Sequence, residues 1–105
     1  MKLFLVHCGF YDPSLCDGQY ESHVNFFVAA TDAEGAKRAA KALPDFQIRK
    51  MHIDGLQEVE AVGGHTVRLA ENPALAGQTI LKGVHFRELA SPAKNHIKFN
   101  GIGDS

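Results

Sequence analysis

The sequence lacks the features that most directly reveal a function. Its 105 residues carry a formal net charge of −1, so there is no excess of basic side chains with which to hold nucleic acid. It also has no long apolar run, because the opening LFLV stretch is too short for a signal peptide or a membrane span and is followed by a histidine. We therefore expect a cytoplasmic protein that binds neither nucleic acid nor a membrane.

Cysteine is scarce, and its spacing excludes a Cys-x-x-Cys motif. In a reducing compartment Cys8 and Cys16 are expected to be free thiols, Cys8 buried in a strand and Cys16 in a loop. Histidine, by contrast, is abundant. The six histidines are dispersed along the chain, so they do not come from an affinity tag.

Internal repeats and low-complexity segments are absent too, and the length limits the number of domains. With 45% hydrophobic residues the chain can bury one modest core but not two. We expect a single α+β domain over residues 1–90. Residues 91–105 combine Pro, Asn and Gly without periodicity, which predicts a C-terminal tail or arm.

The clearest element signal is a strand that leads directly into a helix. Residues 23–30 are apolar on both faces, which is typical of an interior strand. Thr31 and Glu34 match a capping box at the start of the helix. Alanines recur along one side of this helix, so that side is expected to face a sheet, and Pro44 marks its end.

A second interior strand is predicted over residues 3–8, which are also apolar on both faces. The long connection over residues 9–20 is either a functional loop or a wide antiparallel connection whose aromatic side chains cover a core edge. After the helix the chain returns through residues 45–50, and Asp54–Gly55 gives a turn signal.

The strongest hairpin signal is Gly63–Gly64. We expect a three-residue loop that includes His65, because this register pairs Ala61 with Val67 and keeps apolar side chains together. Residues 79–89 give a weaker strand signal.

Together these elements predict an α+β fold with an antiparallel sheet in the order β-β-α-β-β, plus a C-terminal strand or arm. One main helix packs on one face of this sheet. Because a single helix cannot cover both faces, another subunit or the C-terminal arm must cover the other. We therefore expect a homodimer.

Two pairs of titratable residues have the spacing of a shared strand face. Glu21 and His23 are two residues apart, as are His52 and Asp54, so each pair can point to one side of its strand. If the two segments are neighbours in the sheet, the pairs meet at a sheet end. The remaining candidates for this polar cluster are His7, on the opening strand, and two aromatic residues of the long connection, Tyr11 and Tyr20.

The structural alternative is that Asp54 caps a turn, Glu21 lies in solvent and the histidines bind backbone groups. Four segments nevertheless resemble a small bacterial family, domain of unknown function 1543: KLFLVHCGFYD, YESHVNFFVAA, EGAKRAAKA and MHIDGLQEVEAVGGHTVRL. The similarity runs from about Lys2 to Leu69. It implies no established activity, substrate or cofactor, but the two polar pairs coincide with the polar marks of the family. The sequence departs from the family at His7 and Cys8.

Three functions follow from these residues. The first is a homodimeric binding module that holds a small polar ligand at the cluster. The second is a small enzyme in which His23 or His52 is the general base and a carboxylate orients it, although no nucleophile is evident. The third is a divalent-metal site made from both histidines and a carboxylate, for which the short-range His-x-x-x-His spacing is missing. The sequence assigns no catalytic residue, metal ligand set or cofactor.

Overall fold

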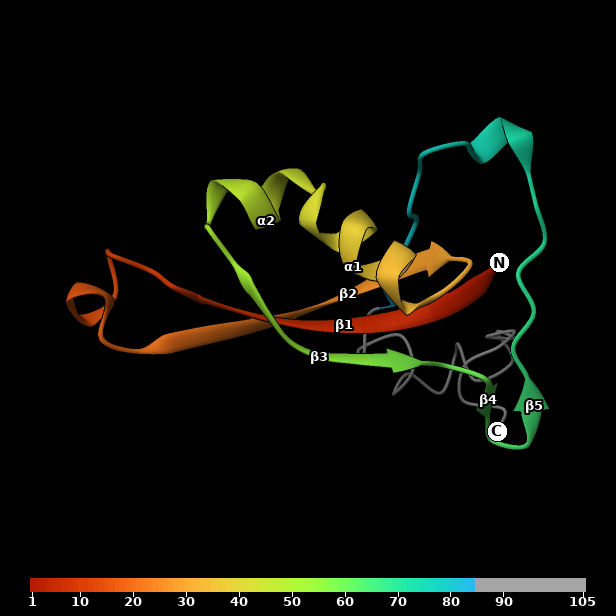
Figure 1. Ribbon diagram of the computed structural model, residues 1–105, viewed down its shortest axis with the longest axis horizontal. Helices are drawn as coiled ribbons and strands as arrows, with labels where there is room; N and C mark the ends of the chain where they lie inside the picture. Colours follow the sequence, from red (N-terminus) through yellow and green to blue (C-terminus); the bar gives the residue numbers. More distant parts are fainter. Residues whose placement is uncertain (85–105) are drawn as a thin grey trace, which may run out of the picture. The chain divides into compact units, whose positions relative to one another are not determined.

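The computed structural model describes residues 1–84 (Figure 1). The chain divides into two units, Met1–Asn72 and a second unit that begins at Pro73. All of the described strands and α-helices belong to the first unit, and residues 73–84 contribute the 3-10 helix η2 (Pro73–Leu75). The predicted domain boundary at residue 90 and the C-terminal tail lie outside the described residues.

A three-stranded antiparallel sheet forms the centre of the first unit. Strand β1 (Lys2–Tyr11) lies between β2 (Glu21–Ala30) and β3 (His52–Glu58), in the order β2-β1-β3. Two helices, α1 (Ala33–Lys41) and α2 (Pro44–Ile48), lie on the same side of this sheet (Figure 1). The predicted α+β class, with an antiparallel sheet and a helix on one face, is confirmed.

The core lies between the sheet and the helices. Successive side chains of a strand point to opposite faces, and the even-numbered residues of β1 face the helices, where apolar burial stabilises the fold. The core residues are Phe4, Val6, Cys8, Val28, Ala30, Ala36, Ala40, Phe46 and Met51. We call the opposite side of the sheet the cluster face, because it carries the polar residues described below.

The capping box predicted at Thr31 is wrong. Helix α1 begins one residue later, with Asp32 as the N-cap, and the Asp32 carboxylate accepts a hydrogen bond from the Gly35 amide at 2.7 Å. A carboxylate is a strong N-cap acceptor and interacts favourably with the helix dipole. Pro44 follows α1 as expected, but it also occupies the first turn of α2, where its missing N–H has no cost. The segment through which the chain was expected to return therefore begins as a helix, Pro44–Ile48.

The turn predicted at Asp54–Gly55 is a β-bulge within β3. Cys8 pairs with Ile53 and His7 pairs with Gly55, so Asp54 is the extra residue on the longer strand. A bulge and a turn favour the same residue types, which is why the local sequence did not distinguish them.

The predicted three-residue loop at Gly63–Gly64 is also wrong. Ala61 pairs with Thr66 across a strict two-residue turn that joins β4 (Ala61–Val62) to β5 (His65–Thr66). Both glycines have positive φ, 56° and 81°, and a two-residue hairpin turn with positive φ at both central positions matches the strand twist. The backbone preference of the two glycines outweighs the side-chain pairing on which the longer loop was predicted.

The long connection is shorter than expected, because β1 extends to Tyr11 and the 3-10 turn η1 (Cys16–Gly18) occupies its middle. Its start is fixed by Asp12, whose carboxylate accepts hydrogen bonds from the amide and hydroxyl of Ser14. No strand forms over residues 79–84, and the rest of the strand predicted there lies outside the described residues. None of the helices in residues 1–84 has the length and apolarity needed to span a bilayer.

Candidate functional site

The two predicted polar pairs lie side by side on the cluster face. Gly9 in β1 pairs with His23 in β2 and with His52 in β3, so the two histidines flank the central strand in one row. Glu21 precedes His23 by two residues, and the bulge at Asp54 places its carboxylate beside His52. We call these four residues, Glu21, His23, His52 and Asp54, the His/acid cluster.

Each imidazole of the cluster contacts both carboxylates. His23 Nε2 lies 2.5 Å from Glu21 Oε1 and 3.3 Å from Asp54 Oδ2. His52 Nε2 lies 3.0 Å from Glu21 Oε2 and 3.1 Å from Asp54 Oδ1. Two nitrogens and four oxygens therefore face one another in a closed ring, and the side chains are 28 to 44% exposed. Neither a turn cap nor backbone bonding accounts for these residues.

Tyr11 joins the cluster from the end of β1, directly opposite Glu21. Its hydroxyl donates a hydrogen bond to the Glu21 carboxylate, and the charge of that carboxylate raises the pKa of Tyr11. The partial burial of Glu21 would raise the pKa of its carboxyl group. Hydrogen bonds from His23 and Tyr11 and the nearby imidazoles outweigh this effect and lower the pKa of Glu21.

Gly9 makes room for the cluster. A Cβ atom at this position would lie 2.6 Å from Asp54 Oδ2 and 2.7 Å from His52 Nε2, well inside normal contact distance. The backbone of β1 thus forms the floor of the site, and a larger residue than glycine there would displace the ends of both side chains.

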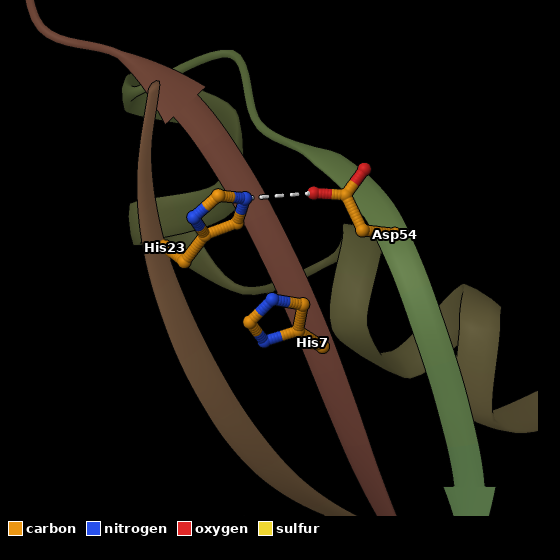
Figure 2. Close-up of side chains that lie close together, drawn as sticks. All are labelled: His7, His23 and Asp54. Atoms are coloured by element: carbon orange, nitrogen blue, oxygen red, sulfur yellow. Dashed lines mark ion pairs between the residues drawn. The ribbon is translucent and has the colours of Figure 1, made fainter. Parts of the chain in front are cut away.

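His7 lies next to the cluster, one row further along the same face. Figure 2 shows it on the central strand, between the strands that carry His23 and Asp54. Its ring stacks on that of His23, with centroids 4.8 Å apart and planes 9° apart. Its Nδ1 lies 2.7 Å from Asn25 Oδ1.

Six of the seven residues predicted for the polar cluster are therefore together. The exception is Tyr20, which is 63% exposed and, within residues 1–84, makes no hydrogen bond or ring contact with the cluster. Both thiols are free, Cys8 buried and Cys16 exposed. Cys8 belongs to the helix side of the sheet, where burial, and to a lesser extent the charge of Asp54, raises the pKa of its thiol. A thiol with a raised pKa is a poor nucleophile.

A comparison with protein families matches residues 18–69 to the model described as Domain of Unknown Function (DUF1543). Residues 18–69 form a DUF1543 domain. All four residues of the His/acid cluster lie within the match, whereas β1, with His7 and Gly9, lies outside it. No curated protein and no solved structure matches the chain significantly.

The site residues predicted for the DUF1543 domain did not include Gly9 and Asn25, which lie beside the cluster. Each nevertheless has a recognisable feature in the sequence. Gly9 is a glycine inside a strand, which often marks a close approach of the backbone to another group. Asn25 is a polar residue in an otherwise apolar strand segment. Their roles depend on strand register, which the sequence did not give.

Two grooves border the cluster. One, of about 470 Å³, continues along the cluster face and is lined by Leu5, His7, Asn25, Gly55, Leu56 and Gln57. The other, of about 600 Å³, lies beyond Tyr11 and is lined in part by Arg49, Lys50, Asp12 and Asp45. The lining of the first contains no Asp, Glu, Lys or Arg, and that of the second contains both acidic and basic side chains.

Proposed function

We propose that the DUF1543 domain binds one divalent transition-metal ion through the His/acid cluster. The observation that carries this proposal is the closed ring of contacts in which each imidazole Nε2 faces two carboxylate oxygens from different residues. Imidazole and carboxylate together are the ligand types of zinc and similar ions.

Hydrogen bonds alone account poorly for this ring. A neutral imidazole with a hydrogen on Nε2 can direct it well at one oxygen only, so the second contact is left weak. Without that hydrogen, the lone pair of Nε2 faces two negatively charged oxygens. A cation bound to Glu21, His52 and Asp54, whose donor atoms all lie within 4.8 Å of one another, accepts lone pairs from these three side chains. His23 can then donate a hydrogen bond to a carboxylate oxygen.

The spacing of the donor atoms supports the same conclusion. Ligands bound about 2.0 to 2.2 Å from a zinc ion are about 3 to 3.5 Å from one another. The nitrogen–oxygen distances of His52, 3.0 and 3.1 Å, fall in this range, and donor atoms of Glu21, His52 and Asp54 all lie within 4.8 Å of one another. Strands β2 and β3 fix the spacing, so little ordering of the chain is needed on binding.

Isothermal titration calorimetry of the full chain with zinc chloride tests the proposal. We expect one zinc ion per chain, with weaker binding at pH 5 than at pH 7.5, because protons compete for the imidazole nitrogens. The double variant His23→Ala/His52→Ala should lose this binding. His65→Ala, which removes an exposed histidine of β5, should bind zinc like the unmodified chain. Absence of zinc binding, or undiminished binding by the double variant, would refute the proposal.

We propose further that the protein is cytoplasmic and a homodimer. The helices cover one side of the sheet, while the cluster face carries apolar side chains, among them Phe27 at 43% exposure. Multi-angle light scattering should give twice the mass of one chain. A monomeric mass at all concentrations would refute the homodimer without affecting the metal site.

A further inference from the structure

The ring nitrogens of His7 have different roles. Nδ1 lies 2.7 Å from Asn25 Oδ1, and an amide oxygen can only accept, so Nδ1 carries the hydrogen. Nε2 is then left with its lone pair. A ring nitrogen of His7 lies within 4.8 Å of the donor atoms of His23 and Asp54, and Figure 2 shows one nitrogen of the His7 ring on the side of the ring nearer these two side chains.

His7 is poorly oriented to bind the same ion as His23. An imidazole binds a metal in the plane of its ring, and the two rings are stacked with planes only 9° apart. Stacked parallel planes share no point at which one ion could lie in both. The Nε2 lone pair of His7 is therefore available as a hydrogen-bond acceptor beside the metal position.

The groove along the cluster face begins at His7. Its lining contains two leucines, a glycine and the amides of Asn25 and Gln57, with no Asp, Glu, Lys or Arg. An ionised group placed there would lose hydration without gaining a charged partner, which is unfavourable. A neutral molecule with both polar and apolar parts fits this lining.

The charge of the proposed metal site favours a neutral ligand too. The carboxylates of Glu21 and Asp54 carry two negative charges, which balance a divalent cation. A site with no net charge has no long-range attraction for an anion, unlike one in which neutral histidines alone hold the ion.

We propose that the metal site takes a small uncharged molecule that coordinates the ion through oxygen and donates a hydrogen bond to His7 Nε2. The rest of this molecule lies in the groove beside Asn25 and Gln57. This inference rests on the proposed metal site and adds to it the chemical class of the ligand and the part played by His7.

The test uses the full chain loaded with zinc and two probes of similar size. Acetamide is uncharged, offers one carbonyl oxygen to a metal and has N–H donors, whereas acetate is an anion of the same size without a donor. We expect calorimetry to show that acetamide binds about tenfold more tightly than acetate, a ratio that corresponds to one hydrogen bond.

The variant His7→Phe keeps an aromatic ring against His23 but removes the acceptor. It should weaken acetamide binding about tenfold and leave zinc affinity unchanged. Asn25→Ala, which keeps His7 but releases its Nδ1 hydrogen, should weaken the same probe to a smaller extent. His65→Phe is the matched control and should leave both affinities unchanged.

Each other outcome overturns the inference. Equal or tighter binding of acetate shows that the site does not select neutral ligands. Unchanged probe binding by His7→Phe shows that His7 does not contact the ligand, and a loss of zinc affinity in this variant shows that His7 is a metal ligand. If the unmodified chain binds no zinc, the metal site itself fails. If it binds zinc but not the probe, only the present inference fails.

Discussion

Gly9 shows how a single residue determines whether the cluster can form. It lies under the ring of contacts, and a methyl group there would come within 2.7 Å of both Asp54 and His52. The partners of β1 are tied to it by many backbone hydrogen bonds, so the side chains rather than the strands have to move.

We therefore predict that Gly9→Ala lowers zinc affinity by at least about tenfold. This is the usual effect of a mutation that disturbs the groups that orient metal ligands. The far-ultraviolet circular dichroism spectrum should stay unchanged. Gly55→Ala is the matched control, because its added Cβ would meet only the Cβ of His7 at an ordinary 3.6 Å. Equal zinc affinity of Gly9→Ala and the unmodified chain would contradict the close packing described here.

The contact between Tyr11 and Glu21 gives a prediction about pH in the metal-free protein. The charge of Glu21 raises the pKa of Tyr11 above its ordinary value of about 10. In a Tyr20→Phe background Tyr11 is the only tyrosine, so tyrosinate absorbance follows its titration alone. Adding Glu21→Gln should bring the pKa of Tyr11 back toward the ordinary value.

The sign of the effect on stability follows from linkage. Because the folded state raises the pKa of Tyr11, this contribution to stability is fully present below pH 10 and is lost as pH rises through the raised pKa. Urea unfolding should show that Glu21→Gln loses less stability over this range than the Tyr20→Phe parent. An equal loss would mean that Glu21 does not act on Tyr11.

At the scale of the element, the start of α1 has two adjacent residues of types that can cap a helix, Thr31 and Asp32, and Asp32 is the N-cap. Asp32→Ala should lower the free energy of unfolding by about 1 kcal/mol, because the Gly35 amide loses its acceptor. Thr31→Ala should change it by less than about 0.5 kcal/mol. Urea denaturation of both variants measures the difference. A larger loss of stability in Thr31→Ala than in Asp32→Ala would show that Thr31 is the N-cap after all.

The end of α2 contains a residue in an unfavourable conformation. Lys50 has φ of 51°, and the amide of Met51 bonds to the carbonyl of Phe46 in the pattern that normally favours glycine. Lys50→Gly should therefore raise the free energy of unfolding by up to about 1 kcal/mol. Lys37→Gly, the same change within α1, should lower it by a similar amount. A stability loss in both variants would contradict the left-handed conformation of Lys50.

For the whole molecule, the sequence predicted the strands β1 and β2, but it did not predict that β3 continues through Asp54–Gly55 or how the strands align. The apolar runs of β1 and β2, and the Glu-x-His and His-x-Asp spacings, were sufficient to expect two polar pairs at one sheet end. The alignment of His23 and His52 on either side of Gly9 depends on long-range register, which local spacing does not contain. The bulge at Asp54 was likewise hidden, because its residues also favour a turn.

The central claim is that side chains of β2 and β3, on either side of β1, hold one divalent metal ion. The most direct test is a crystal structure of the zinc-loaded full chain, with anomalous difference density measured at the zinc absorption edge. We predict one peak about 2.0 to 2.2 Å from Nε2 of His52, with Glu21 and Asp54 as further ligands. No peak at this position, or a peak at a cysteine instead, would contradict it.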